Sequence, residues 1–138
     1  MLFRSLVVSA RTTAAGQIDA FYLRFNGETN DTNNSNRYLE GNGSGAGSGT
    51  NLYNILTDAA GSTTNTFSNY SIYIPNYTSS NQKSISIDGV TENNGATAYA
   101  DLIAYRWTGT AAINRITLTP NNNLVQYSSA YLYGIKNS

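Results

Sequence analysis

The chain has 138 residues, a formal net charge of zero and only 12% charged residues, and it contains no cysteine and no histidine. These absences exclude disulfide bonds, thiolate nucleophiles, histidine acid–base catalysis and the usual zinc ligand sets. No run of Lys or Arg indicates binding to nucleic acid or to an anionic membrane, and no apolar stretch approaches the roughly 20 residues of a membrane helix.

Uncharged polar residues dominate the composition. The chain holds 19 Asn, 16 Thr, 15 Ser and 12 Gly, which favour turns and strand faces over helix interiors. Eleven Tyr add aromatic side chains that suit a pleated surface. We therefore expect one all-β domain that spans residues 1–138.

Period-two alternation of apolar and polar residues predicts seven strands. They cover residues 2–8, 18–25, 70–74, 84–90, 101–107, 114–119 and 130–135. An eighth strand is predicted around residues 37–39. Pro75 and Pro120 are expected to end their strands, and Asp88-Gly89 is expected to form a turn. Arg4 and Ser5 interrupt the apolar start, which favours a strand there over a signal peptide.

Three further segments lack this alternation. Residues 51–60 could form a short helix, because Leu52, Ile55 and Leu56 have helical spacing. Residues 26–36 and 41–50 have almost no apolar content, and the second is predicted to be a mobile surface loop rather than a domain linker. The fold predicted from these patterns is an antiparallel, jelly-roll-like β-sandwich of about eight strands with long polar loops.

No residue pattern predicts a catalytic site, so we expect that the chain is not an enzyme and uses no cofactor. Its eight acidic residues are scattered singly, and no pair has a spacing that would force two carboxylates together for glycoside hydrolysis. Glu28 and Asp31, with Asn26, Asn30 and Asn33, offer oxygen ligands that calcium could use. No EF-hand spacing is present and Asn-rich turns look the same without a metal, so no metal site is predicted.

Exposed tyrosines are the most informative candidates for a binding role. Tyr22, Tyr73, Tyr77 and either Tyr131 or Tyr133 are placed by the alternation on outward strand faces. Such side chains can stack on sugar rings or anchor a protein interface. The alternative is that they fill the core and pair across strands. The sequence assigns no single Tyr to either role.

Four segments resemble a module that recurs in tailed-phage virion proteins. In that module a strand ends in the pattern Arg-hydrophobic-Asn-Gly/Ser-Asp/Glu-Thr, which is similar to Phe21-Tyr-Leu-Arg-Phe-Asn-Gly-Glu-Thr here. The module then has an aromatic-Leu-x-Gly-x-Gly segment, which is similar to Asn36-Arg-Tyr-Leu-Glu-Gly-Asn-Gly-Ser. Residues 56–75 resemble its Phe-centred strand that leads into Asn-Tyr, and Ser128-Ser-Ala-Tyr-Leu-Tyr-Gly-Ile-Lys-Asn resembles its terminus. The resemblance implies a jelly-roll-like virion component, often trimeric, that serves as a capsid decoration protein or as part of a tail fibre or tail tip.

Between these roles, the sequence favours a capsid decoration (cement) protein, because no heptad repeat, shaft repeat or long attachment segment is present. We expect homotrimers to bind the major capsid protein lattice on the outer surface of the head and to stabilise the shell. Relatives of this module often carry a further segment before the strand that resembles residues 6–13, whereas this chain opens almost directly on it, so either that strand is lost or the chain is a trimmed domain. A missing edge strand would leave unpaired backbone for a neighbouring subunit to complete. The alternatives are a tail-fibre or tail-tip domain that binds a receptor or glycan, and a cellular carbohydrate-binding or TNF-like lectin domain.

Overall fold

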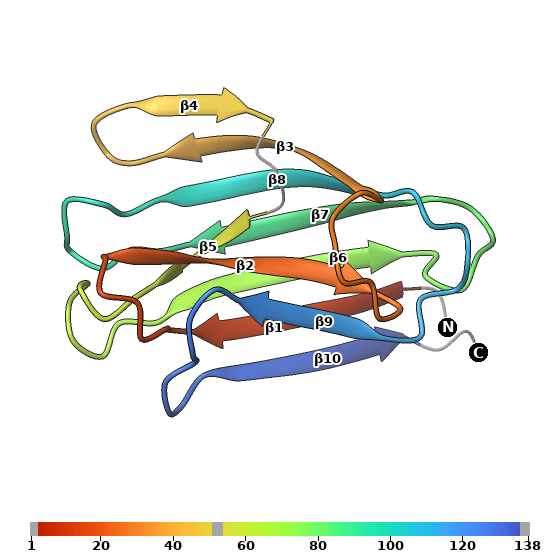
Figure 1. Cartoon of the computed structure of the whole chain (residues 1–138). Coiled ribbons are helices and arrows are strands. Elements are labelled where there is room, and N and C mark those ends of the chain that lie inside the picture. The colour runs from red at the N-terminus through yellow and green to blue at the C-terminus, as the bar shows by residue number, and fades with distance from the viewer. Residues whose placement is uncertain (1–2, 51–53, 136–138) are drawn as a thin grey trace.

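The computed structural model describes residues 3–50 and 54–135, which form ten strands and no helix (Figure 1). The strands are β1 (Phe3–Ala10), β2 (Ile18–Phe25), β3 (Asn34–Gly41), β4 (Ala46–Gly49), β5 (Asn54–Asp58), β6 (Ser68–Pro75), β7 (Lys83–Val90), β8 (Ala100–Trp107), β9 (Ile116–Pro120) and β10 (Ser129–Ile135). All seven predicted strands are present within a few residues of their expected bounds, and the eighth is β3.

Two antiparallel sheets of unequal width pack face to face. The larger has seven strands in the order β10-β1-β6-β7-β8-β3-β4, and the smaller has three in the order β5-β2-β9. The predicted antiparallel β-sandwich is therefore confirmed, with ten strands in place of about eight. In Figure 1 the small sheet lies in front of the middle of the large one, so β10 at one side and β3 and β4 at the other extend beyond it.

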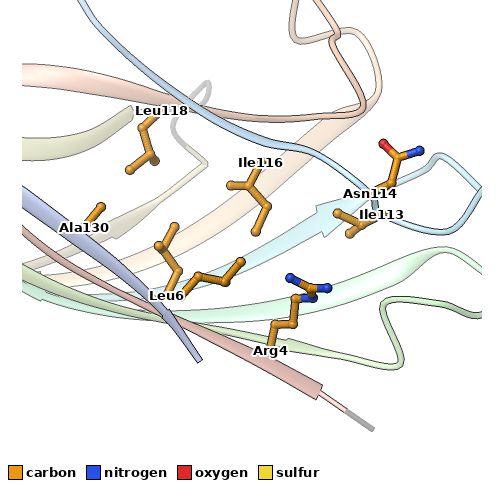
Figure 2. Close-up of a pocket in the computed structure, with 8 residues that line it drawn as sticks. Arg4, Leu6, Ile113, Asn114, Ile116, Leu118 and Ala130 are labelled. Atoms are coloured by element: carbon orange, nitrogen blue, oxygen red, sulfur yellow. The ribbon is translucent and has the colours of Figure 1, made fainter. Parts of the chain in front are cut away.

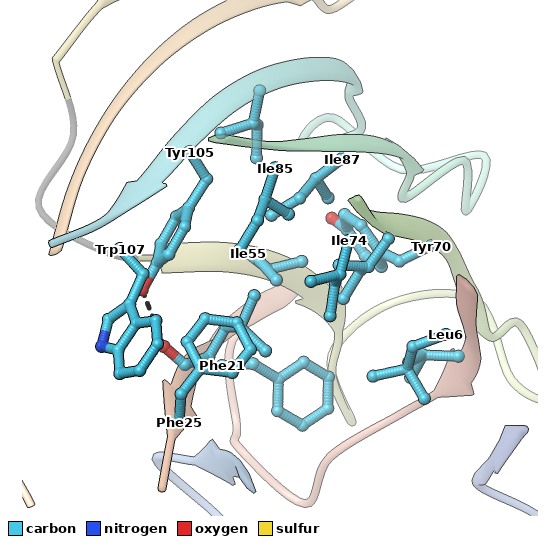
Figure 3. Packing of buried hydrophobic residues seen from close by; sticks show 14 of the residues in the cluster. Leu6, Phe21, Phe25, Ile55, Tyr70, Ile74, Ile85, Ile87, Tyr105 and Trp107 are labelled. Carbon is cyan, nitrogen blue, oxygen red and sulfur yellow. Dashed lines mark hydrogen bonds between the residues drawn. The ribbon is translucent and has the colours of Figure 1, made fainter. Parts of the chain in front are cut away.

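The core lies between the sheets and follows from the alternation of the strands. In β6, β7 and β8 every second residue is buried, and these inward residues meet Phe21, Leu23 and Phe25 of β2 (Figure 3). Phe25 packs at 5.4 Å from the ring of Trp107, measured between centroids. The Tyr105 hydroxyl donates a 2.8 Å hydrogen bond to the Leu23 carbonyl, which ties β8 of one sheet to β2 of the other.

The helix considered for residues 51–60 is wrong over the part that the structure describes. Residues 54–58 form β5, which pairs antiparallel with β2. Ile55 and Thr57 are buried, and the Thr57 hydroxyl donates to the Ala10 carbonyl at 3.0 Å. A strand forms here because its backbone pairs with the edge of β2 that β9 leaves open. Leu52, one of the three residues that suggested a helix, lies outside the described residues.

The Gly/Ser segment 41–50 is a β-hairpin rather than the expected mobile loop. The side-chain oxygen of Asn42 accepts hydrogen bonds from the amides of Ser44 and Gly45, and β4 then returns along β3. At Gly49 a Cβ atom would lie 3.0 Å from the Tyr38 hydroxyl. Glycine therefore lets the tyrosine ring lie against the backbone of β4.

Asp88-Gly89 forms no turn, which corrects a second local prediction. Both residues continue β7 and pair with β6 and β8. A Cβ atom at Gly89 would lie 1.9 Å from the Tyr70 ring, so the glycine makes room for that ring on the inner face of the sheet. Close packing of this kind is one of the reasons for glycine inside a strand.

Candidate interaction surfaces

The acidic residues considered for calcium are held in separate structural contacts. Glu28 Oε1 accepts from Trp107 Nε1 at 2.9 Å and from Asn33 Nδ2 at 2.7 Å, whereas both carboxylate oxygens of Asp31 accept from Arg24. The described part of the chain holds no group of three or more acidic, His or Cys side chains placed to bind a metal. None of the described segments is a helix long and apolar enough to cross a membrane.

The outer face of the seven-stranded sheet, which points away from the small sheet, gathers most of the exposed apolar side chains. Strand registers put directly paired residues on one face. Ten large apolar side chains are exposed within residues 4–50 and 55–134, and by this criterion seven of them lie on the face that points away from the small sheet. They are Val7, Leu39, Tyr73, Val90, Leu102, Tyr131 and Tyr133. We call these seven residues and the small side chains between them the outer face.

Few charges interrupt this outer face. Among its described residues, Arg37, Asp88 and Arg106 are charged, and most of the others are Ser, Ala or apolar. Two shallow hollows lie on it. One, of about 420 Å³, includes Leu39 and Leu102 in its lining, and a second of about 410 Å³ includes Val7, Val90 and Asp88. Large exposed apolar patches mark interaction sites more often than accidental surface.

Sequence alternation correctly places Tyr73 and either Tyr131 or Tyr133 on an outward face, and it misplaces Tyr77. Tyr73, Tyr131 and Tyr133 are exposed, and Ser5 pairs with both Tyr73 on β6 and Tyr133 on β10. Tyr77 is wrongly predicted, because it is buried, with the Arg4 guanidinium 4.5 Å from its ring centroid. Tyr77 follows Pro75, the last residue of β6, so strand alternation no longer sets its direction.

Tyr22 is half-buried on the small sheet, away from the outer face. The Arg24 guanidinium lies 4.8 Å from its ring centroid.

The four aliphatic members of the outer face were missed by sequence reasoning. A signal was available for Val7, Val90 and Leu102, since each is an apolar residue at an outward position of an alternating strand. Leu39 had no such signal, because the inward residues of β3 include Asn34 and Asn36.

A second apolar surface lies at the side of the sandwich, between β9 and β10. This seam is a cleft of about 360 Å³, and its lining is drawn in Figure 2. Its apolar lining comes from both sheets and from the segment before β9: Leu6, Ala130 and Leu132 on one side and Ile113, Ile116 and Leu118 on the other. Leu132 remains 47% exposed because the small sheet ends at β9 and does not cover it.

The buried ionisable groups serve the fold. Burial raises the pKa of Asp101 to about 6, and the nearby Glu40 carboxylate adds to the shift. Burial also raises the pKa of Asp58, against a hydrogen bond from Asn93 Nδ2 at 2.8 Å. The Arg11 guanidinium donates to backbone carbonyls of the loop after β5. Asp58 and Arg11 line neither hollow of the outer face nor the seam, whereas Asp101 is among the residues that line the hollow beside Val7 and Val90.

Comparison with protein-family models, with curated proteins and with solved structures finds no match to this chain.

Proposed function

We propose that the protein is a phage virion structural protein that decorates the outer surface of the capsid, with no enzymatic activity. In this proposal the outer face docks on the major capsid protein lattice. The single observation that carries it is the concentration of exposed apolar side chains on one broad sheet face with few charges. The phage setting comes from the resemblance of the sequence motifs to virion modules.

The mechanism would be mechanical. Each square ångström of apolar surface removed from water contributes about 25 cal/mol before the entropic costs of association are subtracted, so a broad sheet face can drive docking without any single strong contact. Because the decoration protein binds the assembled shell and not its separated subunits, binding stabilises assembly by mass action. Association of several copies, as in the homotrimer that the resemblance implies, adds multivalency.

Location in the particle tests the proposal directly. We expect purified virions to carry many copies of the protein on the head. Quantitative mass spectrometry of separated heads and tails measures this distribution, and labelled-particle imaging locates the copies. A few copies confined to the tail would refute the decoration role.

A charge substitution tests the docking surface. Leu102→Glu places a carboxylate in the middle of the outer face, where burial against the capsid would require its desolvation. We expect at least a tenfold loss of binding to undecorated heads, measured by co-sedimentation. Leu124→Glu is the matched control, because Leu124 is exposed to 48% and Leu102 to 51%, but Leu124 lies in the β9–β10 connection. Equal binding by the two variants would show that the outer face does not dock.

A second function, glycan or receptor binding at the tail, is favoured by one observation. Tyr73 and Tyr133 are exposed on the outer face two strands apart with the small Ser5 between them, and Tyr131 lies beside them. Aromatic rings in this position can stack on sugars. Saturable binding on a glycan array, lost in Tyr133→Ala but kept in Tyr127→Ala, would support this function over decoration.

A further inference from the structure

The edge strand β10 is unprotected. It pairs with β1 along its whole length from Ser129 to Ile135, and its other side has no strand partner in the described part of the chain. Proteins usually block long edge strands with charges, proline, bulges or short length. β10 has seven residues and none of these features, whereas the opposite edge, β4, has four residues, of which two are glycine.

The seam beside β10 is also incomplete. On the inner side of β10, Leu132 faces the apolar cleft next to β9, and β9 is itself the last strand of its sheet. On the outer side, Tyr131 and Tyr133 are exposed to 59% and 56%. A strand added to β10 would therefore need an apolar residue facing inward and aromatic or apolar residues facing outward.

We propose that the missing strand is β10 of a second copy of this chain, paired antiparallel across a two-fold axis. β10 itself has the required pattern, with Leu132 inward and Tyr131 and Tyr133 outward. β10 itself carries no charge, so its own side chains bring no like charges together on self-pairing. The charged residue in the lining of the seam, Arg4, lies on β1, and its guanidinium is 4.5 Å from the Tyr77 ring centroid. An isologous contact of this kind requires a self-complementary surface, and a neutral strand with a symmetric pattern meets that requirement.

The register follows from the length of the strand. Leu132 is the middle residue of Ser129–Ile135, so a two-fold axis through it pairs all seven residues. Leu132 then lies opposite Leu132 of the second copy, and Tyr131 lies opposite Tyr133 of the second copy. Both leucines face the same side, between the two β9 strands, where they fill the seams of both copies.

This arrangement joins the two large sheets edge to edge. Because the two-fold axis is perpendicular to the sheet, both outer faces point in the same direction and form one wider surface. β10 and the seam are sufficient for this dimer, which forms whether or not the outer face binds a capsid. It predicts a dimer, whereas the resemblance to virion modules implies a homotrimer, and the two are separable by experiment.

Cysteine cross-linking tests the register, since the chain has no native cysteine to interfere. Directly opposed Cα atoms in an antiparallel pair lie about 4.5–5.5 Å apart, within the range that a disulfide spans. We expect mild oxidation of Leu132→Cys to give a disulfide-linked dimer in most of the protein. Leu124→Cys and Leu102→Cys, at similarly exposed leucines outside the seam, are expected to remain monomers on the same non-reducing gel.

A second variant tests association without a covalent link. Leu132→Lys places a charge in the seam, and two such charges would meet across the two-fold axis, whereas in the monomer the ammonium reaches water. Sedimentation velocity is expected to show a wild-type dimer and at least a tenfold weaker association for Leu132→Lys, with Leu124→Lys unchanged. A wild-type trimer, a wild-type monomer at every concentration, or cross-linking of Leu102→Cys in place of Leu132→Cys would overturn the proposal.

Discussion

At the scale of single residues, Asp101 is a buried carboxyl group whose ionisation destabilises the folded state. Its side chain is 8% exposed on the inner face of β8, and Glu40 pairs with it directly on β3. The Tyr70 hydroxyl donates to Asp101 Oδ2 at 3.4 Å. Burial, with the repulsion from Glu40, raises the pKa of Asp101 to about 6 from an ordinary value of 3.8. The folded state therefore binds this proton more tightly than the unfolded chain does.

The sign of the resulting pH dependence follows from linkage. Below about pH 4 Asp101 is protonated in both states, and as pH rises to about 6 the unfolded chain loses the proton first, so stability falls. At about 1.36 kcal/mol per pKa unit, the loss reaches up to about 3 kcal/mol. We expect Asp101→Asn to raise the free energy of unfolding near pH 7 by a large part of this amount and to change it little near pH 3.5.

Urea unfolding of wild type, Asp101→Asn and Asp88→Asn at both pH values measures the effect. Asp88 is a control because it is exposed on the opposite face of the same sheet. A variant whose advantage over wild type is the same at both pH values would contradict this assignment for Asp101.

At the scale of elements, Lys83 joins two loops at one end of the sandwich. Its side chain is 2% exposed, and Nζ donates to the carbonyl oxygens of Ser79 and Asn81 at 2.7 Å and of Ala111 at 2.8 Å. The first two acceptors lie in the β6–β7 connection and the third in the β8–β9 connection. Nζ also lies 5.3 Å from the centroid of the Trp107 ring.

Replacing this lysine by an apolar residue of similar length leaves three carbonyl groups without their donor. Buried polar groups that lose a partner cost about 1–3 kcal/mol each when water cannot reach them. We expect Lys83→Met to lower the free energy of unfolding by about 2–4 kcal/mol, measured in urea, while the exposed neighbour in Gln82→Met changes it by less than about 0.5 kcal/mol. A loss below about 1 kcal/mol for Lys83→Met would show that water replaces the ammonium at no great cost.

Element prediction succeeded where the alternation was regular and failed where a neighbouring strand decided the conformation. β6, β7 and β8 alternate strictly, and both their existence and their buried faces were predicted. β4 contains no large side chain, so its pairing with β3 depends on the Asn42 turn and on the fit of Tyr38 against Gly49. Gly89 looks like a turn residue in isolation, and only the ring of Tyr70 explains it as a strand residue.

At the scale of the whole molecule, the unequal widths of the sheets produce both candidate surfaces. Three strands cannot cover the inner side of seven, so the inner face of β10 stays open beside β9 and forms the seam. The outer face, in turn, is assembled from strands that are distant in the chain, with Val7 near one end and Tyr133 near the other. Its extent is visible only once the strand order β10-β1-β6-β7-β8-β3 is known.

The sequence by itself determined the fold class, most of the strands and the absence of cysteine and histidine chemistry, because composition and period-two alternation are local properties of the chain. It also placed Tyr73 and either Tyr131 or Tyr133 on outward faces, and the structure shows all three of these tyrosines exposed. Only the tertiary structure decided which outward residues share one face, because strand order and register arise from pairings between distant segments. For the same reason only the structure shows that β10 and the seam are left without a covering strand in the described chain.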